Sequence, residues 1–503
     1  MIKRSLIFIH RWLGVALCLF FLIWFPSAIG MMYWDFPSVS ADDRLERSTA
    51  LNGAAIKFSP EQALAALGDS RPPDQVRLNT LDGRPVYRVR TGRSERLVYA
   101  DTGEIQAAPS HEMMARVASA WSGQTISSAT IESIDVDQWT VQGSYRSLKP
   151  LWKYSWPNGE QIYVSQISGE VVQYTTTASR IGAYLGPIPH WLYFTALRKH
   201  QLAWTRVVIW SSGIGTAGAV IGIVVGVWMY SPRKRYRYAG ATTSIPYRGQ
   251  KRWHMLLGLA FGVGAATWAF SGMLSMDPFP IGRPLRDEGG GIPQALRGRA
   301  LAAGLAADPR AALRHLGTET VKELQITSFG TEPVYVGIIG RRTSVIVTLD
   351  GRVLKEFDRR QIADLVTSAA GPAGIAELRE LKEYDWYYLD RRGSRPLPVI
   401  LARLNDAAQT RYYIDPRTAR IVGAYSSRNW MSRWLYHGLH SLDVPWLYKH
   451  RPAWDIVVIA LMLGGSALSV TSLILAWRVV GRTLLRRVEE SSIREQATGD
   501  PVS

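Results

Sequence analysis

The sequence predicts a membrane α-helical protein with four transmembrane helices, an internal duplication and two α+β domains outside the membrane. Three observations lead to this prediction. Four apolar runs are each long enough to cross a bilayer, the same motifs recur about 250 residues apart, and two long polar segments carry alternating, strand-like patterns. The mean hydropathy of −0.04 hides this arrangement because it averages the apolar runs with the polar segments.

The predicted transmembrane helices are the four apolar runs, each of which offers about 20 largely apolar residues. The first run follows Lys3, Arg4 and Arg11, as in a signal peptide, but it is too long and lacks a small-residue cleavage site. We interpret it as an uncleaved signal anchor. The four predicted spans are residues 1–34, 206–230, 253–276 and 454–477.

The placement of basic residues predicts the topology. The chain holds 59 Lys and Arg against 41 Asp and Glu, a net charge of +18, which by itself would suggest a nucleic-acid partner. The loop 231–252, however, contains seven of these basic residues and no acidic residue, and the tail 478–503 opens with four arginines, Arg478, Arg482, Arg486 and Arg487. Positively charged loops stay in the cytoplasm. We therefore expect both termini inside and no nucleic-acid partner.

The two long segments, 35–205 and 277–453, then lie on the outer side of the membrane. Cys18 is the only cysteine, which excludes an intrachain disulfide and any zinc or iron–sulfur site built from cysteines. Such sparse cysteine usage is compatible with a bacterial periplasm. The expected location is the bacterial inner membrane, in multi-pass form.

A duplication relates the two halves of the chain. A shift of 244 residues superposes the first and third spans, and a shift of 250 superposes the second and fourth, with Lys199-His200 falling on Lys449-His450. Parallel repeats of this kind place matching residues around a pseudo-twofold axis along the membrane normal. The matches of the first shift include His10 with His254, Gly14 with Gly258, Trp24 with Trp268, and Ser27 with Ser271.

Each outer segment combines a short helix with antiparallel hairpins. Pro60 and Pro309 stand at the first turn of predicted helices, preceded by Ser59 and Asp308 as caps. Apolar or alternating strands closed by polar, Gly-containing turns predict hairpins. The predicted hairpins cover residues 97–105, 162–171, 345–353 and 412–421. We expect a small helix on an antiparallel sheet.

These residues carry a resemblance to a known family. The segment Ser59–Leu64 with the hairpin Val98–Glu104 resembles the PepSY domain, and Ile9–Gly14 with Tyr436–Asp443 is similar to the PepSY-associated transmembrane family. The resemblance covers nearly the whole chain and implies PepSY-like periplasmic domains and a link to siderophore iron uptake. Some family members are haem-containing reductases of ferric siderophores. PepSY domains also occur in protease-inhibitory propeptides, so the domain alone does not decide a function.

Two histidines at the inner ends of the spans are candidate haem ligands. His10 and His254 each have a glycine one turn later, Gly14 and Gly258, on the same helix face. The histidine offers an axial nitrogen, and the glycine leaves room for a flat macrocycle. Two such faces related by the repeat predict bis-histidine ligation of a haem b iron. The alternative is that both histidines lie among lipid headgroups beside neighbouring arginines.

A second, outer ligand pair is predicted before spans two and four. His190, His437 and His440 lie on apolar, aromatic stretches, and His437 and His440 can face the same side of a helix. The favoured pair is His190 with His440, or with His437 in its place. His200 and His450 also match in the repeat, but their basic neighbours favour a role as headgroup anchors. The number of haems, one or two, stays open.

The predicted function is electron transfer across the membrane. Metal sites near the two ends of a span of about 30 Å would form an electron path. The electrons would come from a separate donor, either cytoplasmic or a quinol, and would reduce a ferric complex outside, which the resemblance implies is a ferric siderophore. The alternative is a non-enzymatic PepSY protein that binds or regulates a periplasmic partner.

The substrate would need a binding surface on the outer domains. Aromatic and basic clusters offer one, although packing between strands explains most of them better. These clusters comprise Trp139, Tyr145, Arg146, Trp152, Trp156 and residues 384–388. Transport of the iron complex itself is disfavoured because the spans lack charges at mid-membrane depth.

Overall fold

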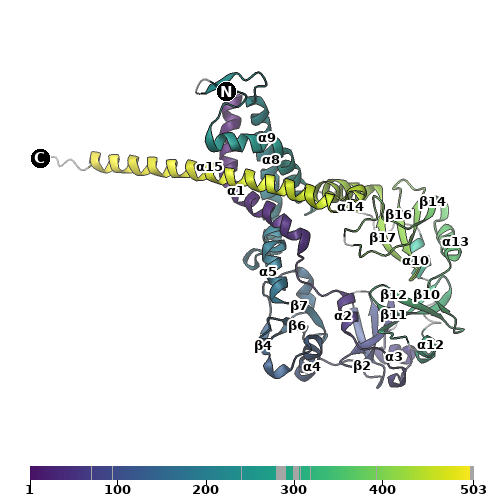
Figure 1. Ribbon diagram of the computed structural model, residues 1–503. Coiled ribbons are helices and arrows are strands. Elements are labelled where there is room, and N and C mark those ends of the chain that lie inside the picture. The colour runs from purple at the N-terminus through teal and green to yellow at the C-terminus, as the bar shows by residue number, and fades with distance from the viewer. Residues whose placement is uncertain are drawn as a thin grey trace. The chain divides into compact units, whose positions relative to one another are not determined.

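The chain forms two compact units (Figure 1). The computed structural model describes residues 1–69, 71–92, 94–238, 241–278, 291–297, 305, 307–317, 319–391 and 393–498. The helical unit comprises residues 1–36, 178–280 and 431–503, and the sheet-containing unit comprises residues 37–177 and 281–430. The predicted segments 277–453 and 478–503 therefore include residues, such as 279–290 and 499–503, that lie outside the described ranges.

The helical unit is built on four long helices, each long and apolar enough to cross a membrane. This confirms the four long apolar helices that the sequence predicts. In α15 the candidate span is the part Ala453–Thr483. The four helices are α1 (Ile2–Tyr33), α8 (Gln201–Met229), α9 (Gly249–Leu274) and α15 (Ala453–Thr498).

The four helices form a bundle in which each packs mainly against two others, in the cyclic order α1, α8, α9, α15. Small residues let the helices approach closely. A Cβ atom on Gly465 of α15, for example, would lie 2.5 Å from the Phe25 ring of α1, and the Phe261 ring of α9 lies equally tightly against Gly464. Aromatic side chains thus occupy the space that glycines leave free.

Short elements lead into α8 and α15 and form the loop between α8 and α9. Before α15 the chain forms a π-helix, an irregularity that often marks functional sites. These elements are α5 (Thr177–Leu185), α6 (Pro187–Trp191), α7 (Thr195–Arg198), the hairpin β8 (Tyr236–Tyr238) and β9 (Ala241–Thr243), the π-helix η6 (Met431–Gly438) and α14 (Pro445–Lys449).

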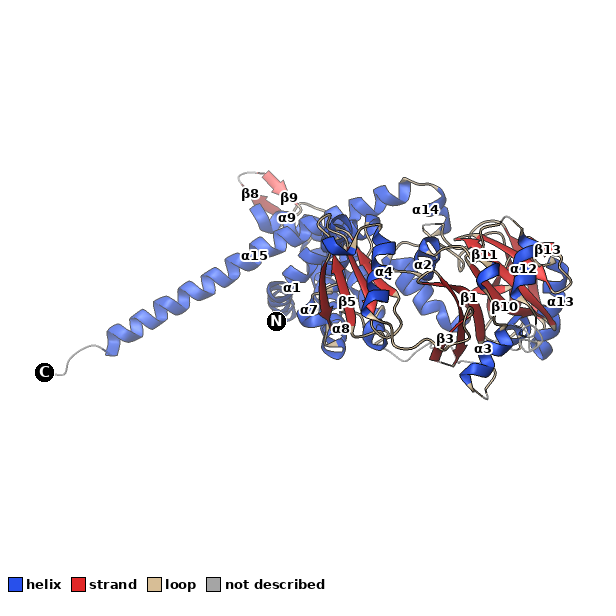
Figure 2. Ribbon diagram, turned by 90° about the horizontal axis from the view of Figure 1, so that it is seen from below, coloured by secondary structure: helices blue, strands red, loops and turns tan. Residues whose placement is uncertain are grey.

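The sheet-containing unit centres on one seven-stranded antiparallel sheet; Figure 2, which colours all strands red, labels β1, β3, β10, β11 and β13 of this sheet. Its strand order is β13-β12-β11-β10-β1-β2-β3. Strand β1 (Gln75–Leu81) pairs with β10 (Glu323–Phe329), with Val76 opposite Ile326, so both long polar segments contribute to a single sheet. The other strands are β2 (Arg84–Thr91), β3 (Ser94–Tyr99), β11 (Glu332–Gly340), β12 (Thr343–Thr348) and β13 (Val353–Leu354).

Two helices cover this sheet and begin where the sequence predicts. Helix α3 (Pro60–Leu67) is capped by Ser59 in a capping box, and α12 (Pro309–Leu316) is capped by Asp308. Their buried faces join the strands of both segments in one apolar core, which includes Ala63, Leu78, Ala312 and Leu324.

Two four-stranded antiparallel sheets complete the unit, one covered by a single helix and the other by two helices. All four predicted hairpins are confirmed, the one at 97–105 as a single bridge between Val98 and Ile105. One sheet holds β4 (Thr130–Ile134), β5 (Leu151–Ser155), β6 (Gln161–Ser165) and β7 (Val171–Thr175) under α4 (His111–Ser122). The other holds β14 (Ile375–Leu381), β15 (Val399–Leu404), β16 (Arg411–Asp415) and β17 (Arg420–Tyr425) under α10 (Ile292–Arg297) and α13 (Arg359–Ala369).

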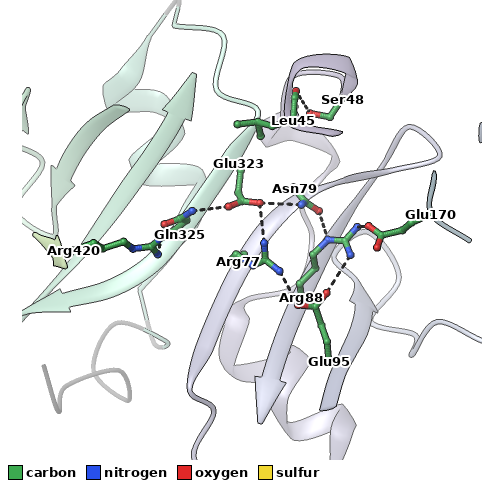
Figure 3. Close-up of polar contacts among 10 residues, drawn as sticks. All are labelled: Leu45, Ser48, Arg77, Asn79, Arg88, Glu95, Glu170, Glu323, Gln325 and Arg420. Atoms are coloured by element: carbon green, nitrogen blue, oxygen red, sulfur yellow. Dashed lines mark hydrogen bonds and ion pairs between the residues drawn. The ribbon is translucent and has the colours of Figure 1, made fainter. Parts of the chain in front are cut away.

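A polar network connects the three sheets (Figure 3). The Arg88 guanidinium, on β2, lies 2.6 Å from Glu170 in the turn between β6 and β7 and 3.4 Å from Glu95 on β3. Glu323 on β10 accepts from Gln325, whose amide oxygen accepts from Arg420 on β17. Because the charges in this network have partners of opposite sign or amide partners, its role is to hold the sheets together.

Candidate functional site

His10 on α1 and His254 on α9 face each other inside the helix bundle. Their ring centroids lie 6.1 Å apart, with 36° between the ring planes. A metal–imidazole bond measures about 2.0–2.1 Å, so two imidazoles on opposite sides of one metal ion hold their ring centres about 6 Å apart. The structure thus brings the two predicted inner residues together at a spacing that admits one metal ion.

Hydrogen bonds orient both inner rings. His10 Nδ1 lies 3.0 Å from the Gly218 carbonyl oxygen, which can only accept, so Nδ1 carries the proton. His254 Nδ1 lies 3.2 Å from Thr471 Oγ1, whose own proton goes to the Leu468 carbonyl. In both rings Nδ1 is therefore the donor, and Nε2 keeps the lone pair that a metal requires.

A cavity of about 460 Å³ opens beside the inner pair and is lined by all four long helices. Its volume falls within the range of about 300–1,000 Å³ found for cofactor sites. Both predicted glycines line it, and no side chain approaches a Cβ position on Gly14 within 4 Å. Each histidine pair offers two imidazole nitrogens, which would suit an iron whose other ligands come from a macrocycle. The residues present at this site therefore fit a haem.

Gly222 on α8 is a site residue that the sequence analysis did not identify. A Cβ atom at this position would lie 2.5 Å from His10 Cε1 and 3.0 Å from Nδ1. The signal in the sequence was the spacing of Gly218, Gly222 and Gly226, which indicates a smooth helix face. That spacing does not show that one of these glycines receives a histidine ring.

The outer pair consists of His190 on α6 and His440, which follows the π-helix η6. Their ring centroids lie 6.0 Å apart, with 62° between the ring planes. His440 Nδ1 lies 2.9 Å from Ser271 Oγ, and His190 Nδ1 lies 3.1 Å from the Trp24 carbonyl and 3.3 Å from Ser27 Oγ. The spacing matches that of the inner pair.

Ser27 and Ser271 are buried and orient the two outer rings in the same way. Each hydroxyl gives its proton to a backbone carbonyl of its own helix, Ser27 to Ile23 and Ser271 to Trp268. The hydroxyl oxygens then accept from the histidines, which leaves Nε2 of His190 and of His440 with the lone pair. In the sequence, the match of Ser27 with Ser271 under the 244-residue shift was the signal that could have identified these two serines as supports of the outer rings.

The other candidate histidines lie elsewhere. His437 Nδ1 lies 3.7 Å from an Asp443 carboxylate oxygen, and the His437 side chain is half exposed, at 51%. His450 Nδ1 bonds to the Trp446 carbonyl, and both His200 and His450 are exposed. Of the two alternatives for the outer partner of His190, the structure brings His440 to it.

Most of the aromatic residues considered for substrate binding belong to the core of the sheet-containing unit. Trp139, Tyr145 and Trp156 are all less than 10% exposed, and Tyr388 is fully buried. Trp386 is an exception at 47% exposed. The structure therefore agrees with a packing role for Trp139, Tyr145, Trp156 and Tyr388.

Comparison with known proteins does not assign this chain to a family. No protein-family model matches this sequence, and no curated protein is similar to it. The fold and the site thus define a membrane protein with four long apolar helices and two facing histidine pairs, and the resemblance to the PepSY-associated transmembrane family stays a prediction.

Proposed function

We propose that this chain is a b-type haem protein of the bacterial inner membrane that passes electrons across the bilayer and reduces ferric iron, bound to a siderophore, in the periplasm. One observation carries the proposal: two histidine pairs, with ring centroids 6.1 Å and 6.0 Å apart, whose Nδ1 atoms all face hydrogen-bond partners. A bound iron porphyrin supplies one-electron redox chemistry.

The chain's own residues would hold and isolate this group. His10 and His254 would hold the iron, and the cavity beside them would take the porphyrin, with Gly14 and Gly258 leaving space against α1 and α9. His190 and His440 would hold a second group at the other end of the bundle. The proposal therefore covers one haem or two, with the inner site supported by both ring spacing and cavity.

Aromatic side chains connect the two ends of the bundle. Phe21 and Phe25 line the cavity, their ring centroids lie 6.0 Å apart, and Phe25 lies 6.1 Å from Trp268. The Trp268 indole donates to the backbone carbonyl of His440, at 2.9 Å. Packed atoms thus run continuously from the inner cavity to an outer ligand, which supports electron transfer between the two sites.

The direction of transfer follows from the charges and the family resemblance. The basic loop 231–252 favours a cytoplasmic position for the end that carries His10 and His254. The donor would be a cytoplasmic reductant or a quinol in the bilayer, and the outer unit would hold a ferric siderophore or another ferric complex. Reduction releases the iron because Fe(II) binds hard oxygen ligands more weakly than Fe(III).

An absorption spectrum of the full chain in detergent tests the proposal. We expect a reduced-minus-oxidised α band of the b type, and we expect His254→Ala to lose one haem equivalent while His450→Ala, at an exposed histidine, keeps all of it. A preparation that stays colourless after growth with added haem would contradict the proposal. It would favour a PepSY protein that binds or regulates a periplasmic partner without redox chemistry.

The reaction itself is measured in proteoliposomes. With reductant enclosed and a ferric siderophore outside, the wild type should produce Fe(II), detected with a chromogenic chelator. The variants His254→Ala and His440→Ala should reduce the rate by at least about tenfold. Equal rates in empty liposomes would show that the Fe(II) does not come from this protein.

A further inference from the structure

The cavity beside His10 and His254 has a strongly basic mouth. Lys251 on α9 and Arg478 and Arg482 on α15 all line it. Lys251 precedes His254 by three residues, about one helical turn, and Arg478 follows Ser472, beside the His254 ring, by six residues, about 9 Å along the helix axis. The three cations therefore gather at one end of the cavity, beyond the histidine pair.

These cations have no acidic partner in the part of the chain that the structure describes. Lys251, Arg478 and Arg482 are exposed and make no ion pair there. Arg11 also lines the cavity, but its guanidinium lies 5.3 Å from the Phe8 ring and 5.7 Å from the Trp12 ring, in cation–π geometry. Lys251, Arg478 and Arg482 are thus the lining cations that have neither an ion pair nor a cation–π contact among the described residues.

The opposite end of the cavity is apolar. Phe21 and Phe25 line it there, and Phe21 lies ten residues beyond Arg11 on α1, about 15 Å along the helix axis. The cavity is therefore amphipathic along its length. Such a shape suits a ligand with an apolar body and negatively charged groups at one edge, because the carboxylates gain charge-assisted hydrogen bonds and the body leaves water.

We propose that Lys251, Arg478 and Arg482 bind the two propionate groups of the porphyrin held by His10 and His254, and so fix its orientation with the carboxylates toward the basic mouth. This inference rests on the proposed function, since it assumes a porphyrin between the two histidines. These residues are positioning residues: they hold the macrocycle while the histidines contact the iron.

The test compares two porphyrins on two variants of the full chain, purified without haem in detergent. The probes are iron protoporphyrin IX and its dimethyl ester, which lacks the negative charges. The mouth variant combines Arg478→Gln and Arg482→Gln. The control variant combines Arg233→Gln and Lys234→Gln, which removes two exposed cations from the basic loop outside the cavity.

We expect the mouth variant to bind the free acid about tenfold more weakly than the wild type and to bind the dimethyl ester equally well. The control variant should bind both probes like the wild type. The reduction potential of the bound porphyrin should also fall in the mouth variant, because removing nearby positive charge disfavours the more negative reduced state. The pair Arg478→Lys and Arg482→Lys should restore most of the affinity, which separates lost charge from misfolding.

Two results would overturn the inference in different ways. If the wild type binds the free acid but the mouth variant loses no affinity, or loses it equally for both probes, the cations do not hold the propionates. They would then bind lipid headgroups or determine the orientation of the helices in the membrane. The proposed function then stands. If the wild type binds neither probe, the proposed function fails together with the orientation.

Discussion

Gly222 of α8 lies directly against the His10 ring of α1, so closely that a Cβ atom at position 222 would lie 2.5 Å from His10 Cε1. The adjacent turn of α8 presents the Gly218 carbonyl oxygen to His10 Nδ1, at 3.0 Å. One helix thus sets both the position and the tautomer of a histidine on another helix. The absence of a side chain at residue 222 is what makes this contact possible.

Replacing Gly222 by alanine should displace the His10 ring. Overpacking of this kind costs about 1–3 kcal/mol, and the ring can relieve it only by moving away from its place opposite His254. We expect Gly222→Ala to lower haem content at the inner site at least about tenfold, as measured by the pyridine haemochrome spectrum. Gly213→Ala is the control, since Gly213 is on the same helix, does not line the cavity and faces only the flexible Met273 side chain. Equal haem content in the two variants would contradict the role of Gly222.

Removing the Ser271 hydroxyl should weaken the outer site. Ser271 Oγ lies 2.9 Å from His440 Nδ1, and loss of such a supporting hydrogen bond lowers metal affinity by about 10–100-fold. Ser271→Ala should therefore release haem from the outer site during dilution and gel filtration. Ser275→Ala, one turn further at the C-cap of α9, removes a hydroxyl that donates to the Gly272 carbonyl and should leave the outer site intact. Retention of all haem by Ser271→Ala would argue against this supporting bond.

His437 and His440 should behave differently although three residues separate them. Only His440 faces His190, while His437 lies near the Asp443 carboxylate. His440→Ala should abolish the low-spin signal of the outer haem in electron paramagnetic resonance, and His437→Ala should leave that signal unchanged. The reverse pattern would exchange their roles.

The sheet-containing unit should become less stable at low pH because the Glu95 carboxylate becomes protonated. Burial by itself would raise the pKa of this carboxyl, but Arg77 and Arg88 outweigh burial and hold the pKa below its usual range. A lowered folded-state pKa means that Glu95 stabilises the fold above the unfolded-state pKa of about 4.3 and that this contribution is lost as the pH falls through the folded-state value.

Glu95→Gln should therefore lower the free energy of unfolding by about 1–2 kcal/mol at pH 7 and much less near pH 3. The difference between wild type and variant is followed by intrinsic tryptophan fluorescence during thermal unfolding of the full chain at both pH values. Glu332→Gln, at an exposed position on β11, is the control and should not change the pH dependence. A wild-type advantage that is the same at both pH values would exclude an ionic contribution from Glu95.

Several parts of this structure were predictable because they depend on neighbours in the sequence. Ser59 and Asp308 begin α3 and α12 as expected, since a cap satisfies amide groups of the very next turn. Three of the four hairpins also form where glycine-containing turns separate apolar strands, while the turn of the hairpin at 412–421 contains Pro416 and no glycine. The pairing of β1 with β10, in contrast, joins residues about 250 positions apart, and strand patterns alone do not specify which edges meet.

The sequence by itself determined the four apolar helices, their basic flanks and the candidate ligands His10, His254 and His190, because hydropathy, charge and repeated motifs can be read along the chain. Only the tertiary structure decided that His440 faces His190 and that Gly222 receives the His10 ring. Residues three apart share a helix face, so which of them reaches a partner depends on how the neighbouring helices pack, and that packing is a property of the whole bundle.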